Sequence, residues 1–157
     1  MVLQFSPLKI KRGWGNLMQP VSPYQKTQSL YWFARLVDKV RLKKTGRLPD
    51  AYFPNLGVGH DEQCLLFLGI KYPDLIAQIE QGFTDEELLA WAYQSGNRPT
   101  DLQVLYWNEY MRKRGWRDDG TPIGVRFLVV KEQLGLKERA DLVTFFDLFE
   151  VDEGRKP

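Results

Sequence analysis

One arginine lies within the apolar stripe of the chain's first strong helical pattern, where it could bind an anion. Apolar side chains recur at helical spacing in residues 28–45, and Arg41 falls on the same face. An arginine that faces a core must find a carboxylate or phosphate, because an unpaired buried charge is costly. Asp38 borders this face and could orient Arg41 in an anion-binding pocket. The competing interpretations are a structural ion pair with Asp147 or Glu150, and a side chain that extends into solvent.

Three other groups could take part in chemistry. Carboxylates can serve as general bases, which makes Asp61 a second candidate, although it is also predicted to cap the helix that follows. His60 and Cys64 stand four residues apart and could share a helix face as a metal or nucleophile site. The favoured interpretation is a surface histidine and a small, buried, inert cysteine.

The composition excludes several classes of protein. The chain has 157 residues with one cysteine and one histidine, which excludes internal disulfides and zinc sites built from several of these residues. We expect no metal and no cofactor. The content of 43% hydrophobic and 27% charged residues is typical of a soluble globular protein. No apolar run is long enough to span a membrane or serve as a signal peptide, so we expect a cytoplasmic protein.

Charge is distributed unevenly along the chain. Residues 1–60 hold 10 Lys/Arg and 2 Asp/Glu, a net charge of +8, whereas residues 61–157 hold 12 and 18, a net charge of −6. An anionic partner could explain this, but neutralisation of one part by the other is favoured. Nucleic-acid binding through residues 9–47 and 112–117, where basic residues flank Trp116, is a weaker hypothesis because no nucleic-acid motif is present.

The periodicity predicts an all-α fold: a single compact domain of six or seven helices over residues 28–155. An irregular arm, residues 1–27, is expected to pack on this body through Trp14. Residues 122–134 have the composition of a strand, but a proline start and a glycine stop favour a helix. The predicted helices span residues 28–45, 61–68, 73–81, 85–95, 101–114, 122–134 and 140–150.

Capping residues predict where several helices begin. Thr84 and Thr100 each head a capping box. Thr27 or Ser29 is expected to cap the first helix. The last helix carries an apolar stripe that is rich in phenylalanine, and the tail that follows it is expected to fray.

Several separated segments resemble a known family. They read LYWFARLVDKVRLKKTGRLPDAYFPNL, DEQCLLFLGI, TDEELLAWA and DLVTFFDLFEVDEGR, in this order. Over about residues 28–155 the chain resembles the bacterial domain-of-unknown-function family 5069. The resemblance implies a small, soluble, mostly helical bacterial protein and no known activity. It marks as positions to test Arg35, Asp38, Lys39, Arg41, Thr144, Asp147, Asp152 and Glu153.

Together these observations favour a cytosolic binding module without catalysis. The expected partner is a small anionic metabolite or a protein, bound by a monomer or homodimer, whereas nucleic acid and membranes are disfavoured. The alternative is an enzyme of unknown reaction that uses Asp38 or Asp61 as general base and Arg41 as anion clamp. The candidate ligand-binding residues are Arg35, Asp38, Lys39, Arg41, Tyr52 and Asp147.

Overall fold

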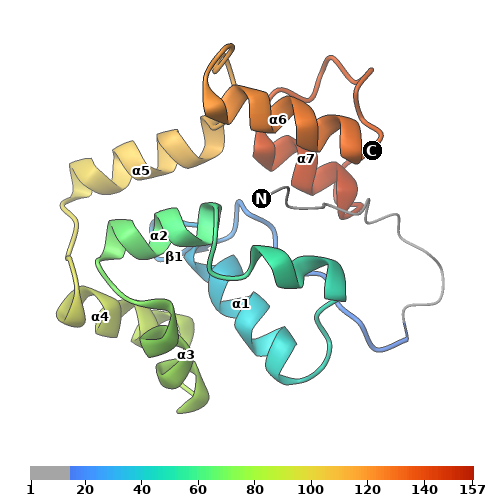
Figure 1. The fold of residues 1–157 in the computed structure, drawn as a ribbon. Helices are drawn as coiled ribbons and strands as arrows, with labels where there is room; N and C mark the ends of the chain where they lie inside the picture. Colours follow the sequence, from blue (N-terminus) through green and yellow to red (C-terminus); the bar gives the residue numbers. More distant parts are fainter. Residues whose placement is uncertain (1–14) are drawn as a thin grey trace. The chain divides into compact units, whose positions relative to one another are not determined.

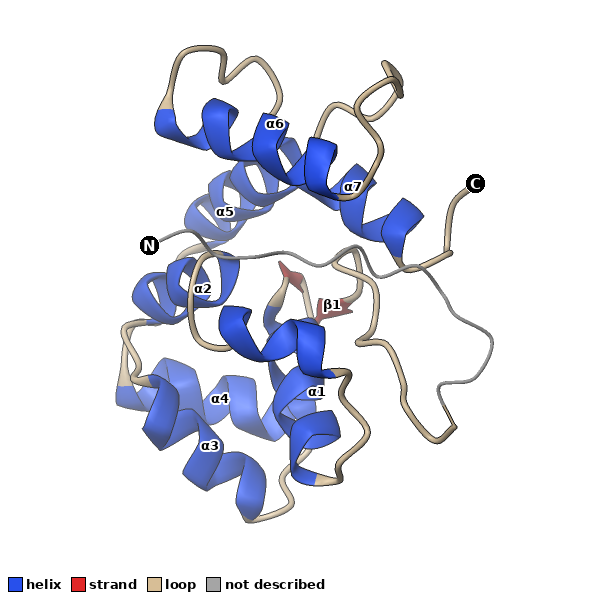
Figure 2. Ribbon diagram, turned by 45° about the vertical axis from the view of Figure 1, so that its right-hand side comes forward, coloured by secondary structure: helices blue, strands red, loops and turns tan. Residues whose placement is uncertain are grey.

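Helices dominate the structure, a computed structural model that describes residues 15–157. In that part of the chain, a short two-stranded hairpin is the only sheet (Figures 1 and 2). The all-α expectation is therefore confirmed, and the ambiguous segment 122–134 is helical. The expected contact of Trp14 with the body lies outside the described residues. The helices are α1 (Phe33–Lys44), α2 (His60–Leu68), α3 (Tyr72–Glu80), α4 (Asp85–Ser95), α5 (Asp101–Lys113), α6 (Pro122–Gln133) and α7 (Phe145–Asp152), with a 3-10 helix η1 at Asp50–Asn55.

The chain is divided into two compact units by its internal contacts. Among the described residues, the larger unit is Asn16–Asn108, and the smaller unit is Gly15 with Glu109–Pro157. Helix α5 begins in the larger unit and ends in the smaller one. Across residues 15–157, every helix is too short or too polar to cross a membrane.

The first helix begins five residues later than predicted, because a hairpin takes its expected first turn. Strands β1 (Lys26–Thr27) and β2 (Leu30–Tyr31) pair antiparallel. Gln28 in the turn and Trp32 at the N-cap of α1 adopt positive φ angles of 52° and 76°. Because non-glycine residues rarely adopt this conformation, the sequence pattern did not reveal it. Neither Thr27 nor Ser29 caps α1.

Capping boxes fix the starts of two helices as predicted. The Thr84 amide donates to Glu87 at 2.8 Å, and the Glu87 amide donates to the Thr84 hydroxyl at 3.2 Å. Thr100 and Gln103 exchange the same two bonds at 2.8 and 3.2 Å. Each box satisfies amide groups that the first helical turn leaves without intrahelical acceptors.

In the smaller unit, α6 and α7 pack around a phenylalanine-rich core. Helix α7 starts at Phe145 and not at residue 140, because Thr144 forms a capping box with Asp147. Asp141 lies before the helix, where hydrogen bonds from Arg139 lower the pKa of its carboxyl to about 2. The core consists of Phe127, Val130, Leu142, Phe145 and Leu148.

The predicted fraying of the tail after residue 150 is wrong for its first part. Helix α7 continues to Asp152. Arg155 then folds back, because its amide donates to the carbonyl of Glu150 at 2.8 Å and its Nε donates to the carboxylate of the same residue at 2.7 Å. A charge-assisted bond of this kind holds the chain against α7.

A close approach between the backbone after α4 and the end of α2 explains why position 96 is a glycine. A Cβ at this position would overlap the carbonyl oxygens of Leu68 and Gly69 at the end of α2.

We expect Gly96→Ala to lower the free energy of unfolding by roughly 1–3 kcal/mol, because overpacking forces the two segments apart. Urea denaturation measures this. Gln94→Ala on the exposed face of α4 is the control, and equal midpoints for the two variants would contradict the close contact.

Candidate functional site

Two of the predicted site residues hold an extended segment of the larger unit against α1. The Arg35 Nη1 donates to the carbonyl of Val21 at 2.7 Å, and the amide of Val21 donates to the Asp38 Oδ2 at 2.9 Å. Side chains one helical turn apart thus bind both polar groups of the same residue. The contact gives Arg35 and Asp38 a structural role in anchoring this segment.

Asp61 lies at the centre of a buried polar network in the larger unit. Its side chain is fully buried. Its Oδ1 accepts from the Lys39 Nζ at 2.6 Å and from the Trp32 Nε1 at 2.8 Å, and its Oδ2 accepts from the Gly57 amide at 3.1 Å. Sequence analysis predicted a helix cap, but Asp61 lies inside the first turn of α2 and bonds α1 and the preceding loop. Three donors satisfy its charge.

Aromatic rings surround this network. The Trp32 ring stacks on His60 with centroids 4.7 Å apart and an interplanar angle of 29°. The Arg35 guanidinium lies 5.4 Å from the Trp32 ring centre and 6.0 Å from that of Tyr52. The structure therefore places Arg35 and Lys39 beside the Trp32 ring and Tyr52 beside Arg35. Of these three candidate residues, Lys39 is the one described in contact with the Asp61 carboxylate.

The network perturbs two neighbouring groups. Partial burial, reinforced by the charge of Asp61, raises the pKa of Tyr72 to about 12. Burial is also the main reason that the pKa of the Cys64 thiol is raised, and Asp61 adds to the effect. Both shifts favour the neutral form of the side chain, so neither group is activated as a nucleophile.

The contacts of Asp38 and Asp61 disfavour these two carboxylates as general bases. A general base must reach a proton on its substrate. Asp61 is enclosed by its three donors, and Asp38 accepts from the backbone of Val21. Among residues 15–157, no three His, Cys, Asp or Glu side chains are grouped in a way that could hold a metal ion.

Arg41 pairs with α4 and not with Asp38. Its Nη1 lies 2.5 Å from the Asp85 carboxylate, and its Nη2 donates to the carbonyl of Phe83 at 2.8 Å. The adjoining cavity of about 490 Å³ is also lined by Glu86, so its charge is net negative. The predicted anion clamp is therefore a structural ion pair at the acidic start of α4.

Asp147 belongs to the smaller unit and caps α7. Its Oδ2 accepts from the Thr144 amide and hydroxyl at 3.0 and 2.9 Å. Its other oxygen lies 3.7 Å from the Lys156 ammonium. These bonds complete the start of the helix.

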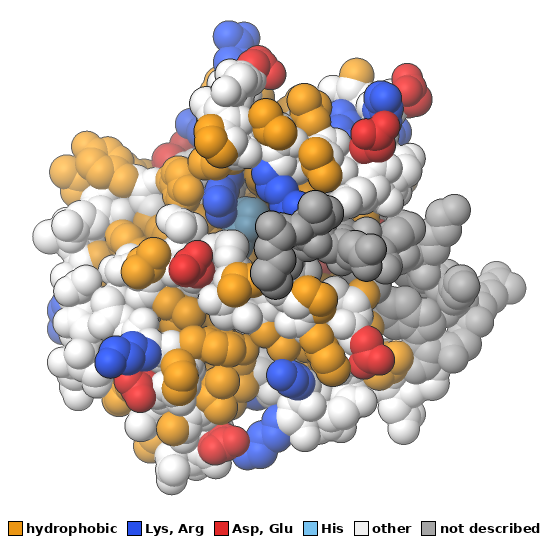
Figure 3. Space-filling view, in the orientation of Figure 1, with side chains coloured by type: hydrophobic (Ala, Val, Ile, Leu, Met, Phe, Trp, Pro, Cys, Tyr) orange, Lys and Arg blue, Asp and Glu red, His pale blue; other side chains and the backbone are white. Residues whose placement is uncertain are grey.

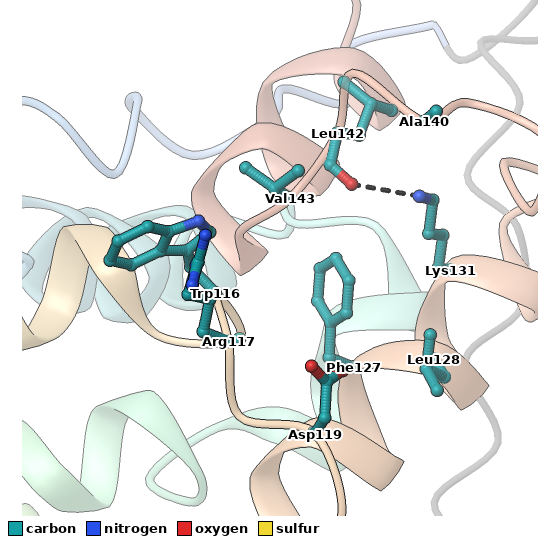
Figure 4. Close-up of a pocket in the computed structure, with 11 residues that line it drawn as sticks. Trp116, Arg117, Asp119, Phe127, Leu128, Lys131, Ala140, Leu142 and Val143 are labelled. Carbon is teal, nitrogen blue, oxygen red and sulfur yellow. Dashed lines mark hydrogen bonds between the residues drawn. The ribbon is translucent and has the colours of Figure 1, made fainter.

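A cavity of about 170 Å³ lies wholly within the smaller unit (Figure 4). It is formed by the loop after α5, by α6 and by residues 140–143. The charged residues of its lining are Arg117, Lys131 and Asp119, which sum to +1. The full lining is Gly115, Trp116, Arg117, Asp119, Gly124, Phe127, Leu128, Lys131, Ala140, Leu142 and Val143.

Lys131 is the most unusual residue of this cavity. Its side chain is nine-tenths buried on α6. The Nζ donates to the carbonyl of Leu142 at 3.0 Å, as the dashed line in Figure 4 shows, and lies 5.8 Å from the centre of the Phe127 ring. Within residues 15–157, no carboxylate forms an ion pair with it. An ammonium has three donors, and a neutral carbonyl compensates only part of its buried charge.

The loop at the cavity is held in a constrained shape. The amide of Gly115 donates to the Asp118 carboxylate at 2.8 Å, and the Thr121 hydroxyl donates to the Asp118 carbonyl at 2.7 Å. Arg117 adopts a φ of 54°, and its guanidinium lies 5.4 Å from the Trp116 ring centre. Non-glycine residues in this conformation concentrate at functional sites.

This cavity was not predicted from the sequence. The basic residues around Trp116 were the one available signal, and they were considered only for nucleic-acid binding. Lys131 gave no signal, because it lies in a segment whose secondary structure was ambiguous and its acceptor, Leu142, lies 11 residues further along the chain.

The fold and these sites define a small, mostly helical protein with charged groups buried in both units. Residues 18–155 match the model of a family described as "Domain of unknown function (DUF5069)", so the chain belongs to this family. The resemblance found in the sequence is thereby confirmed. A comparison with curated proteins found no match.

The ion pair of Asp61 and Lys39 predicts strong energetic coupling. We expect Asp61→Ala to lower the free energy of unfolding by about 3–5 kcal/mol, because it leaves the Lys39 ammonium buried without its counter-ion. The double variant Lys39→Met/Asp61→Ala should lose less than the sum of the single changes in urea denaturation. Additive losses would show that the two charges are not coupled. Glu132→Gln, in an exposed ion pair, is the control and should change little.

The burial of Cys64 predicts a thiol that does not react in the folded protein. Because its raised pKa also suppresses the thiolate, labelling by iodoacetamide at pH 8 should follow global unfolding and become rapid in urea. Mass spectrometry of the labelled protein measures the rate. Rapid labelling of the native protein would revive the nucleophile hypothesis.

Proposed function

We propose that the protein is a binding module without catalysis that holds a small anion in the cavity beside Lys131. The main observation behind this proposal is the buried ammonium of Lys131. It donates a hydrogen bond to the neutral carbonyl of Leu142. The proposal keeps the ligand class expected from the sequence but moves the site. On α1, Lys39 and Arg41 already bind carboxylates of the chain itself.

Electrostatics favour an anion in this cavity. The nearby charge of Asp141 acts on Lys131, but no described carboxylate forms an ion pair with it, so a bound anion supplies a counter-charge in direct contact. The surrounding protein screens that charge less than water does. Arg117 adds a second cation, and a guanidinium can bind a carboxylate with two parallel hydrogen bonds. A single negative charge balances the lining charge of +1.

The chemistry of the lining supports binding rather than catalysis. The cavity is lined by no histidine, cysteine, serine or threonine among the described residues. Asp119 is its one carboxylate, and that side chain is exposed. An exposed carboxylate lacks the low-dielectric environment that tunes a general base to neutral pH.

Thermal unfolding with and without anions tests the proposal. Acetate, benzoate and inorganic phosphate are added at constant ionic strength. At least one should raise the unfolding temperature of the wild-type protein saturably, because a ligand at 100 times its Kd stabilises by about 2.7 kcal/mol. Lys131→Met should abolish the effect. Lys137→Met removes an exposed cation on a neighbouring loop and should preserve it.

Two results would contradict the proposal. One is that none of the three anions stabilises the wild-type protein. The other is an equal response from wild-type protein and Lys131→Met. Should Lys131→Met fail to fold, Arg117→Ala takes its place, because Arg117 is exposed and its removal still lowers the positive charge of the lining.

A further inference from the structure

We infer that the ligand of this cavity is a monocarboxylate with a compact apolar body about the size of one six-membered ring. The inference rests on the proposed anion site and adds the shape and polarity of the rest of the ligand. Three independent features of the cavity support it: its volume, the apolar character of its lining, and its net charge.

The volume of the cavity matches a single small ring or a short branched chain. The cavity measures about 170 Å³. An engineered apolar cavity of roughly 150 Å³ in another protein binds benzene. A ring with one carboxylate therefore matches the space inside the cavity.

The lining provides an apolar floor and an apolar rim. Phe127 and Leu142 are buried at the floor. Trp116, Leu128 and Val143 line the same cavity although they are 47%, 61% and 42% exposed. Exposed apolar residues that gather at one concavity indicate a binding site, since most ligand pockets are apolar with few polar groups.

The figures show how these groups are arranged. Hydrophobic side chains gather over α6 in Figure 3, where the exposed residues are Val125, Leu128 and Val129. In the view of Figure 4, Lys131 and Trp116 lie to opposite sides of the Phe127 ring. This arrangement places the carboxylate of the ligand at Lys131 and its apolar body against Phe127 and Trp116.

The net charge favours one carboxylate over a dianion. Asp119 contributes a negative charge to the lining, so a second charge on the ligand lacks a cation to balance it. Inorganic phosphate, which carries more charge and no apolar surface, should bind less tightly.

Isothermal titration calorimetry of the full chain tests the inference. The probes are acetate, butyrate, benzoate, benzyl alcohol and inorganic phosphate, at pH 7 and constant ionic strength. Affinity should rise up to about fourfold for each buried methylene, equivalent to roughly 0.8 kcal/mol, and benzoate should bind at least about tenfold more tightly than acetate. Benzyl alcohol, which has the ring without the charge, should bind at least about tenfold more weakly than benzoate.

Two variants test the binding of the apolar body and of the carboxylate separately. Leu128→Ala should weaken benzoate by about threefold or more and leave acetate unchanged, because it removes apolar surface from the rim. Leu66→Ala, an equally exposed leucine on α2, is the matched control and should change neither. Lys131→Met should weaken both carboxylates, and circular dichroism confirms that each variant is folded.

Each outcome distinguishes the inference from the proposed function. Equal affinities for acetate and benzoate, both dependent on Lys131, would overturn the inference and keep the anion site. Tighter binding of phosphate than of benzoate would do the same. Binding of benzyl alcohol as tightly as benzoate, or carboxylate affinities that Lys131→Met leaves unchanged, would overturn both.

Discussion

A charged group that folding removes from water must regain its lost interactions inside the protein, and this constraint explains the organisation of both units. In the larger unit it is met. The carboxylate of Asp61 receives donors from Lys39, Trp32 and Gly57, which come from α1, its N-cap and the loop before α2. In the smaller unit it is met only in part, because the buried Lys131 donates to one neutral carbonyl. The difference between these two buried lysines separates a structural site from a candidate ligand site.

The network around Asp61 accounts for features of the larger unit that look functional when taken one at a time. Trp32 combines a positive φ with a hydrogen bond from its indole to the Asp61 carboxylate, and Arg35 beside it binds the backbone of Val21. Buried charges, stacked rings and a strained residue are therefore used to join α1, α2 and an extended segment. Removing one partner of such a network costs far more than removing an exposed ion pair, so these residues are better understood as stabilising the fold.

Local interactions could be predicted from the sequence, whereas distant pairings could not. The capping boxes of α4 and α5 involve residues three apart, and their starts were predicted correctly. The hairpin and the late start of α1 were missed because they involve positive φ angles at two non-glycine residues, Gln28 in the turn and Trp32 at the N-cap. Of the candidate site residues, Arg35 and Lys39 lie beside the Trp32 ring, and Tyr52 lies beside Arg35. Asp61, the partner of Lys39, was expected to cap a helix, because a salt bridge across 22 residues leaves no local pattern.

NMR of lysine side chains labelled with ¹⁵N at Nζ compares the two buried ammonium groups directly. Titration with benzoate at constant ionic strength should move the Lys131 resonance, assigned by its loss in Lys131→Met, along a saturable curve. The Lys39 resonance should stay in place, because its charge is already compensated by Asp61. An unchanged Lys131 resonance, or equal shifts at Lys131 and at the exposed Lys137, would contradict the conclusion that the smaller unit holds an anion site.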